Sequence, residues 1–221
     1  MNGQHPVPAG RPGLLIAFEG IDGTGKSTQI RLLAERLCRE GLPVIATREP
    51  TDGQYGRRIR ELFTNRASIT PEEELALFIA DRREHVDQVI APALGRGTIV
   101  LTDRYYFSTA AYQGALGHDP VAIIAQNETF APVPDLVLLL TAPPAVGVHR
   151  VQQLRQEVLN DFEQEQGLAK VAAIFEGFRQ PFIRRIAGDQ PVTAVQTAVW
   201  EAVALLLRQK GVGPAEKNEE C

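Results

Sequence analysis

The sequence predicts an α/β fold in which a mostly parallel sheet of about five strands is covered by helices on both faces. Two observations lead to this prediction. Short apolar segments alternate along the chain with segments whose apolar residues recur at helical spacing. Glycine-rich or charged motifs directly follow the apolar segments, and in parallel sheets ligands bind beyond the carboxyl ends of the strands. We therefore expect a ligand site at one edge of the sheet.

The first elements are a strand, a glycine loop and a helix. Residues 14–19 form an apolar run, and residues 28–39 carry apolar side chains at helical spacing. Between them, GIDGTGKS at residues 20–27 fits the phosphate-binding pattern G-x-x-x-x-G-K-[ST], the P-loop of many NTPases. The alternative, a glycine-rich turn with a chance Lys-Ser pair, does not account for both flanks. We expect phosphate contacts from Gly20, Ile21, Asp22, Gly23, Thr24, Gly25, Lys26, Ser27 and Thr28.

Later segments continue the alternation. Further strands are expected at residues 42–47, 98–102 and 136–140, with a weak last strand at 182–187. The helix after residue 70 has a capping box formed by Thr70 and Glu73, and Pro92 is expected to kink or end it. Helices are expected at residues 57–63, 71–90, 108–113, 121–130, 145–155, 169–178 and 195–207.

Length and composition fit one domain. The 221 residues are 44% hydrophobic and 23% charged, with a net charge of −4, which is ordinary for a soluble globular protein and argues against a broad nucleic-acid surface. No apolar stretch is long enough to span a membrane. We expect no disulfide between Cys38, on the apolar side of the first helix, and Cys221, which fits a reducing cytoplasm. The expected parts are a flexible leader at 1–13, one domain at 14–208 with a flap at about 150–166, and a polar tail at 209–221.

Charged residues at strand ends indicate a phosphoryl-transfer site. Lys26 is expected to reach the β- and γ-phosphates, and Ser27 and Asp103 are candidate Mg²⁺ ligands. The alternative is that Asp103 only caps the next turn. Arg48 and Arg104 follow the second and third strands, and paired arginines there suit the phosphate of a second substrate better than two separate structural ion pairs.

Phe78 and Arg82 are four residues apart on one predicted helix and share a face. An aromatic ring beside a donor suits a nucleobase. From spacing alone, the favoured interpretation is a core phenylalanine and a solvated arginine. The histidines are scattered, so we expect surface or structural roles for His5, His85, His118 and His149.

Together these motifs resemble the thymidylate kinase family, from residue 14 to about residue 207. The P-loop alone is shared with many unrelated NTPases, but its combination with the later motifs is much more specific. The similar segments are FEGIDGTGKSTQ at 18–29, TREP at 47–50, FIADRREHV at 78–86, DRYYFSTAAYQG at 103–114 and PDLVLLL at 134–140.

The resemblance implies a P-loop kinase that transfers the γ-phosphate of ATP to dTMP, giving dTDP for dTTP synthesis. It also implies Mg²⁺ as cofactor, ATP binding by the residues 20–28 given above, a homodimer, and a cytoplasmic location. Neither nucleic acid nor a membrane is an expected partner. The alternatives are a kinase for another pyrimidine monophosphate, such as dUMP, and a weakly active nucleotide-binding paralogue.

The same resemblance implies roles for individual residues. Asp22, Lys26, Arg48 and Arg104 are expected to be catalytic, with Asp22 binding the sugar 3′-hydroxyl and the two arginines binding the acceptor phosphate. Phe78 matches the aromatic that stacks on thymine, and Arg82 the donor to a base carbonyl. The remaining pocket residues are the ring that excludes a ribose 2′-hydroxyl, Tyr112, the pocket-lining Gln113, and two residues at the base edge, Ser108 and Thr109.

Three positions depart from the family pattern. Thr51-Asp52-Gly53 follows TREP, where close relatives often read Gly-Gly-Thr. Asn160-Asp161-Phe162-Glu163 lacks the flap arginine of many bacterial members, and Gly23 occupies a P-loop position that is arginine in others. An arginine at the transferring phosphoryl group is worth roughly 10³-fold or more in rate. We expect a substitute from the flap helix, with Arg155 preferred over Arg150 because it lies nearer the flap tip.

Overall fold

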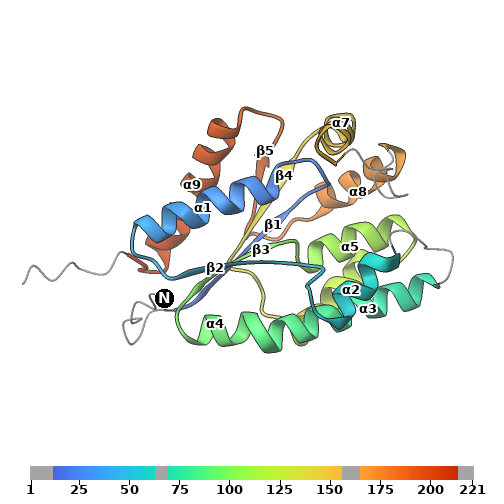
Figure 1. Cartoon of the computed structure of the whole chain (residues 1–221), viewed down its shortest axis with the longest axis horizontal. Helices are drawn as coiled ribbons and strands as arrows, with labels where there is room; N and C mark the ends of the chain where they lie inside the picture. Colours follow the sequence, from blue (N-terminus) through green and yellow to red (C-terminus); the bar gives the residue numbers. More distant parts are fainter. Residues whose placement is uncertain (1–11, 63–68, 156–164, 214–221) are drawn as a thin grey trace, which may run out of the picture.

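A five-stranded, all-parallel sheet forms the centre of the molecule (Figure 1). The computed structural model describes residues 12–62, 69–155 and 165–213. Most of the predicted leader and tail, and the centre of the predicted flap, lie outside these ranges. The sheet confirms the predicted α/β fold. Its strand order is β2 (Val44–Arg48), β3 (Ile99–Asp103), β1 (Leu14–Glu19), β4 (Leu136–Thr141) and β5 (Ile183–Ala187).

Helices cover both faces of the sheet (Figure 1). Along β1, Leu14, Ile16 and Phe18 pack on one side, whereas Leu15 and Ala17 pack on the other, as strand alternation requires. The first side is covered by α1 (Lys26–Arg39) and α9 (Val192–Gln209). The second side is covered by η2 (Val86–Ile90), α4 (Ala91–Gly95), α5 (Tyr106–Ala115), α6 (Pro120–Glu128) and α8 (Glu165–Gly177).

One edge of the sheet collects the motifs that follow the strands. In the parallel register, Asp103 at the end of β3 pairs with Phe18 of β1 on one side and with Arg48 of β2 on the other. The P-loop leaves β1 at this edge, directly after Glu19. Strand register alone therefore brings together residues that lie more than fifty positions apart in the sequence.

A continuous helical rod runs from α3 (Pro71–His85) through η2 into α4. Its start is the predicted capping box, in which Thr70 Oγ1 accepts from the Glu73 N–H and the Glu73 carboxylate accepts from the Thr70 N–H. Pro92 was expected to kink or end the helix, and it does not end it, because the rod continues to Gly95. The turn before it is a π-helix, in which the Ala91 N–H bonds to the Val86 carbonyl, and this wider turn accommodates the proline ring.

Cys38 corrects a second expectation. Its side chain is exposed, although Leu33 and Leu37 on the same helix are buried. Leu33 and Leu37 follow Ile30 at three- and four-residue spacing and face the core, and Cys38 lies one position beyond this stripe. Cysteine is an apolar residue, but the position of Cys38 on the helix leaves it exposed.

Two glycines let α7 (Pro144–Arg155) approach the P-loop. Gly23 has a φ of +79°, and a Cβ built on it would lie 2.3 Å from the Gly147 carbonyl oxygen. Reciprocally, a Cβ on Gly147 would lie 2.5 Å from the Asp22 carbonyl oxygen. The family arginine that Gly23 replaces has no room at this contact, which accounts for that departure in physical terms. Arg150, one turn later in α7, donates to the carbonyls of Gly23 at 3.2 Å and Gly188 at 2.7 Å.

Gly147→Ala is expected to lower the free energy of unfolding by about 1–3 kcal/mol, because the new methyl group forces α7 and the P-loop apart. The measurement is urea unfolding. Gly177→Ala is the matched control, since a Cβ at Gly177 meets nothing within 4 Å and alanine favours the helix. Equal responses of the two variants would contradict the close packing of α7 on the loop.

Candidate active site

The P-loop leads into the amino terminus of α1. Gly25 is the N-cap, with a φ of 93°, and within the described chain no side chain caps this end and the first turn has no acidic residue. A helix start with open N–H groups is a binding site for anions such as phosphate. Lys26 is buried, and its Nζ donates to the carbonyls of Gly20 and Ile21 at 3.1 and 2.9 Å. Burial, followed by the nearby Arg104, lowers the pKa of Lys26 to about 8.

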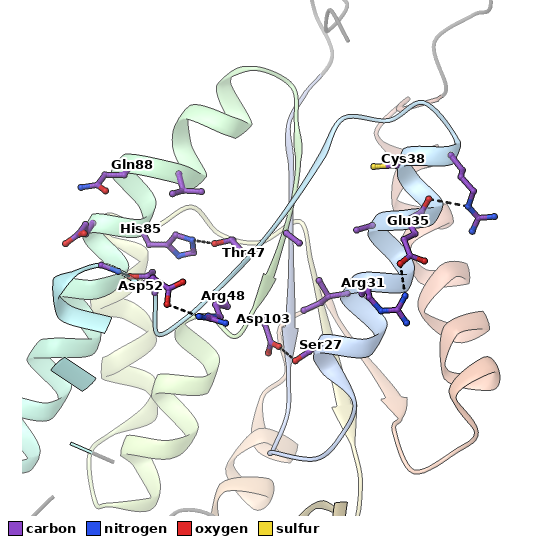
Figure 2. Close-up of a pocket in the computed structure, with 18 residues that line it drawn as sticks. Ser27, Arg31, Glu35, Cys38, Thr47, Arg48, Asp52, His85, Gln88 and Asp103 are labelled. Atoms are coloured by element: carbon purple, nitrogen blue, oxygen red, sulfur yellow. Dashed lines mark hydrogen bonds and ion pairs between the residues drawn. The ribbon is translucent and has the colours of Figure 1, made fainter. Parts of the chain in front are cut away.

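Ser27 and Asp103 are the predicted metal ligands, and the structure brings them together. The Ser27 hydroxyl donates to Asp103 Oδ2 at 2.6 Å across the gap between α1 and β3 (Figure 2). A hydroxyl and a carboxylate are hard oxygen donors that suit Mg²⁺. Within the described ranges no cluster of three or more His, Cys, Asp or Glu side chains could hold a metal. The pair therefore fits an Mg²⁺ whose other ligands are phosphate oxygens and water, the usual arrangement for this ion.

Arg104 connects the P-loop to α5. Its backbone lies in the left-handed region, with a φ of 72°, which turns the side chain toward the loop. Arg104 Nη2 donates to Asp22 Oδ1 at 2.7 Å and to the Tyr112 hydroxyl at 3.2 Å, and Nη1 donates to Ser108 Oγ at 2.8 Å. The neighbouring acidic groups and Tyr112 outweigh the effect of burial and hold the pKa of Arg104 well above its usual value. The guanidinium is thus a fixed cation between Asp22 and α5.

Glu19, which sequence reasoning missed, fixes the start of α5. Its carboxylate is fully buried and accepts from the Tyr105 N–H at 2.9 Å, the Ser108 N–H at 3.1 Å and the Ser108 hydroxyl. The Ser108 hydroxyl therefore lies between Glu19 and Arg104. Burial raises the pKa of Glu19 to about 7 despite these hydrogen bonds. The available sequence signal was an acidic residue at the end of an apolar strand, immediately before the P-loop.

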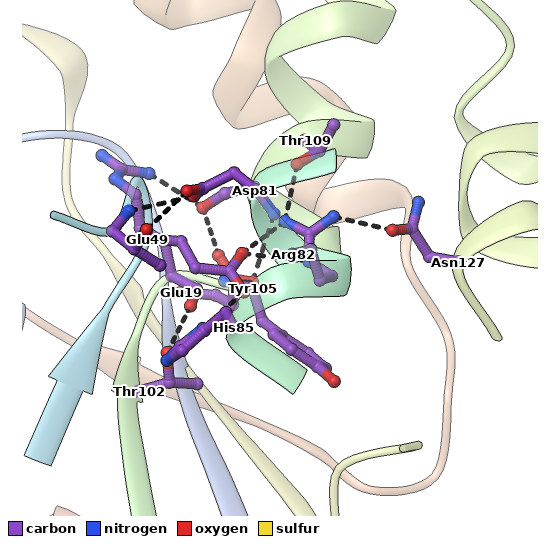
Figure 3. Close-up of polar contacts among 12 residues, drawn as sticks. Glu19, Glu49, Asp81, Arg82, His85, Thr102, Tyr105, Thr109 and Asn127 are labelled. Atoms are coloured by element: carbon purple, nitrogen blue, oxygen red, sulfur yellow. Dashed lines mark hydrogen bonds and ion pairs between the residues drawn. The ribbon is translucent and has the colours of Figure 1, made fainter. Parts of the chain in front are cut away.

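On the other side of α5, Arg82 lies at the centre of a buried polar network (Figure 3). Its guanidinium donates to the Glu49 carboxylate through Nε and Nη2, to Asn127 Oδ1 at 2.7 Å and to Thr109 Oγ1 at 2.9 Å. His85 contacts Glu49 Oε1 through Nδ1 at 3.0 Å and Thr47 Oγ1 through Nε2 at 2.7 Å. The expectation of a solvated arginine is wrong, because Arg82 is buried. His85 has a structural role in this network, one of the two roles expected for the histidines.

Phe78 and Gln113 lie near this network. Phe78 is half-buried and precedes Arg82 by one turn of α3. Gln113 follows Thr109 by one turn of α5, so the two share a face. Gln113 is fully buried, yet among the described residues neither its Oε1 nor its Nε2 has a hydrogen-bond partner. Because buried polar groups are normally bonded, an unpaired amide points to a ligand or to water.

Arg48 is the last residue of β2, the strand next to β3. Its side chain is 62% exposed and donates to Asp52 at 2.8 Å. Arg60 of α2 (Gln54–Leu62) also pairs with Asp52 and donates to the carbonyls of Pro50 and Thr51. The Thr51 hydroxyl and N–H bond to Asp81. The departure from Gly-Gly-Thr is therefore an ordered loop held by its own hydrogen bonds.

A groove of about 1130 Å³ runs along the outer side of β2, between α1 and the α3–η2 rod (Figure 2). Its apolar lining includes Ile30, Ala34, Ala46 and Val89. Of the predicted site residues with described side chains, only Ser27, Arg48 and Asp103 line it. The others lie on the P-loop, on α3, and on α5 or just before it. Arg48 and Arg104 leave neighbouring strands, β2 and β3, but only Arg48 lines the groove. The Arg155 side chain and residues 160–163 lie outside what the structure describes.

Comparisons with known proteins identify relatives over most of the chain. Residues 18–199 match the family model described as thymidylate kinase. A thymidylate kinase of Desulfotalea psychrophila is 53% identical over 197 residues, which covers 89% of this chain and 97% of the relative. A thymidylate kinase of Akkermansia muciniphila is 47% identical over 88% and 93% of the two chains, and one of Xanthomonas campestris is 46% identical over 76% and 73%.

Glu19→Gln is expected to remove a pH dependence of stability. An acid whose pKa rises to about 7 on folding binds a proton more tightly in the folded state, so its contribution to stability is present below about pH 4.5 and is lost as the pH rises through 7. The difference in unfolding free energy between the parent and Glu19→Gln should therefore fall from pH 5 to pH 7.5, measured by urea unfolding. Exposed Glu201→Gln is the control. If this difference in unfolding free energy does not vary with pH, Glu19 does not have a raised pKa in the folded protein.

Proposed function

The chain belongs to the thymidylate kinase family, and from this premise we propose that it transfers the γ-phosphate of ATP to dTMP, giving ADP and dTDP. One observation carries the proposal beyond the family match. The P-loop and α5 meet at Arg104, which bonds to Asp22 of the loop and to Ser108 and Tyr112 of α5. Two nucleotides bound on either side of this arginine have their phosphates next to each other.

The donor side binds ATP through residues 20–28. The open N–H groups at the start of α1 are suited to phosphate oxygens, and Lys26 can exchange its two carbonyl partners for the β- and γ-phosphates. Ser27 and Asp103 would hold Mg²⁺, which when bound neutralises charge on the transferring phosphoryl group. The pKa of Lys26 is lowered in the protein without a bound nucleotide. A bound phosphate favours the charged form of Lys26.

The acceptor phosphate binds Arg104, which follows β3, with Arg48 reaching from the end of the neighbouring strand β2. Arg104 is already fixed, whereas Arg48 is exposed and must leave Asp52 to contact a phosphate. An exposed ion pair contributes only about 0–1 kcal/mol, so this exchange costs little. Asp22 is placed to accept from the sugar hydroxyl, and its hydrogen bond with Arg104 orients it.

The base lies toward α3, with Phe78 stacking on its face. The unpaired Gln113 amide and the Thr109 hydroxyl lie one turn apart on α5 and supply donors and acceptors for the base edge. Arg82 supplies a donor to a base carbonyl. Tyr112 packs beside the sugar, and its hydroxyl is held by Arg104 and Asp22, so the ring is fixed where a ribose 2′-hydroxyl would fall.

We further propose, on the basis of family membership, a homodimer that acts in the cytoplasm. No helix in the described ranges has the length and apolar character needed to cross a bilayer. Arg150 is the one flap-helix arginine whose side chain is described in residues 144–152, and it bonds to main-chain carbonyls of the P-loop and of the loop after β5. This anchoring role leaves Arg155 as the proposed arginine at the transferring phosphoryl group.

ADP release is expected to require both ATP and dTMP. The measurement is ADP formation in a coupled assay with dTMP, dUMP, dCMP or the ribonucleotide of thymine as acceptor, each with and without ATP, and with ATP alone. Strongest turnover with dTMP supports the proposal. ATP hydrolysis without an acceptor would contradict it, as would a preference for dUMP. Turnover too slow to detect would favour a nucleotide-binding paralogue, which the absence of arginine from residues 160–163 keeps as the second candidate.

Tyr112→Ala is expected to reduce the preference for the deoxynucleotide about tenfold or more, because the ring no longer occupies the space of a 2′-hydroxyl. The measurement is kcat/KM for dTMP against that for its ribonucleotide. Tyr112→Phe is the matched control, since it keeps the ring and loses only the hydroxyl. An unchanged preference in the alanine variant would remove Tyr112 from this role.

A further inference from the structure

We propose that Asn127 and Glu49 are specificity-determining positioning residues, which fix Arg82 so that a single N–H is presented to the acceptor base and selects a carbonyl over an amino group. The inference rests on the proposed function, because it takes the space beside Arg82 and Gln113 as the base pocket. It concerns two residues to which the sequence assigned no individual role, although Glu49 lies within the TREP segment. They are 33 and 45 positions away from Arg82.

The guanidinium of Arg82 is restrained on nearly every side. Of its five N–H groups, two donate to Glu49, one donates to Thr109 and one donates to Asn127. The fifth, on Nη1, has no partner among the described residues. One face of the guanidinium lies 5.3 Å from the centroid of the Tyr105 ring. The side chain is 1% exposed, so water does not compete for its orientation. The remaining donor therefore points in a direction that the protein sets.

The groups that restrain Arg82 are themselves fixed. Asn127 Nδ2 donates to the Ile123 carbonyl at 2.8 Å, which directs Oδ1 toward Arg82. On the other side, His85 contacts the second oxygen of Glu49 (Figure 3), and Thr47 contacts His85 (Figure 2). Burial works to raise the pKa of Glu49, but Arg82 and His85 outweigh it and the pKa is lowered, so the carboxylate stays charged. The network is a rigid clamp that extends from β2 to α6.

A fixed arginine can read what the other pocket residues cannot. Thymine presents an acceptor oxygen at position 4, whereas cytosine presents an amino donor there. The Gln113 amide can rotate to offer either oxygen or nitrogen, and the Thr109 hydroxyl can donate or accept, so each can pair with either base. Arginine has donors only, and a donor facing the cytosine amino group is left unpaired in a buried site, which is costly. Discrimination therefore depends on Arg82 being unable to turn away.

Asn127 is the place to test this clamp without leaving a buried charge unpaired. Asn127→Leu keeps the number and branching of the side-chain heavy atoms and removes the acceptor, which frees one side of the guanidinium. Asn127→Asp restores an acceptor and is the rescue variant. Ile124→Ala removes buried apolar surface from the same helix and controls for loss of stability alone. Asn127→Ser, whose hydroxyl is too short to reach Arg82, replaces the leucine variant if that variant does not fold.

The experiment is calorimetric titration of each full-length variant with dTMP and with dCMP in the absence of ATP, with thermal unfolding in parallel. The wild type is expected to prefer dTMP. Asn127→Leu should reduce that preference about tenfold, the equivalent of one charge-assisted hydrogen bond, while Asn127→Asp stays within about threefold of wild type. Ile124→Ala should lower the melting temperature and leave the preference unchanged.

A folded Asn127→Leu variant, or Asn127→Ser variant, with the wild-type preference would overturn the inference and make the network purely structural. A wild type without preference between the two nucleotides would also overturn it. The proposed function has its own test, which is the formation of ADP from ATP and dTMP. A chain that binds dTMP selectively and does not phosphorylate it keeps the base-reading clamp and loses the kinase assignment.

Discussion

The position of Arg104 is the constraint on which the rest of the site depends. Parallel pairing of β1 with β3 places the residues after both strands at one edge, and a left-handed backbone at Arg104 turns its side chain toward the P-loop. There it bonds to Asp22, while Ser108 links it to the buried Glu19. One cation thereby couples the phosphate loop to the helix that carries Tyr112 and Gln113. By bonding to both Asp22 of the P-loop and Ser108 of α5, Arg104 holds the two proposed nucleotide sites relative to each other.

The site is built from buried charges, which are expensive unless they are paired. Glu19 is stabilised by two N–H groups and a hydroxyl, and Arg82 by Glu49, Asn127 and Thr109. Removing one partner of a buried ion pair costs about 3–5 kcal/mol, a large part of the 5–15 kcal/mol by which a domain is stable. These networks therefore set orientation more than they add stability, and orientation is what in-line transfer between two nucleotides requires.

The sequence was informative wherever chemistry follows local spacing. The P-loop, the strand-end Asp103 and the capping box at Thr70 are short patterns with one geometric solution, and the strand alternation predicted the parallel sheet. The Arg82 network was missed because its partners come from β2, α5 and α6, and no spacing relates them. Two expectations failed because they were based on residue type alone. Cys38 was expected on the apolar side of its helix but is exposed, and a π turn before Pro92 allows the helix to continue through the proline. The residues around Asp52 departed from the family pattern and still formed an ordered loop.

The most direct test of the central claim compares two ligands that differ only by a phosphate. Calorimetric titration of dTMP and thymidine into the wild type and into Arg104→Met separates the contribution of the phosphate from that of the nucleoside. If Arg104 is the fixed phosphate-binding cation, the variant should lose affinity for dTMP at least about tenfold more than it loses affinity for thymidine, whose sugar is contacted by residues that Arg104 only orients. Equal losses for both ligands would show that Arg104 only supports the fold of the pocket, and would contradict the account.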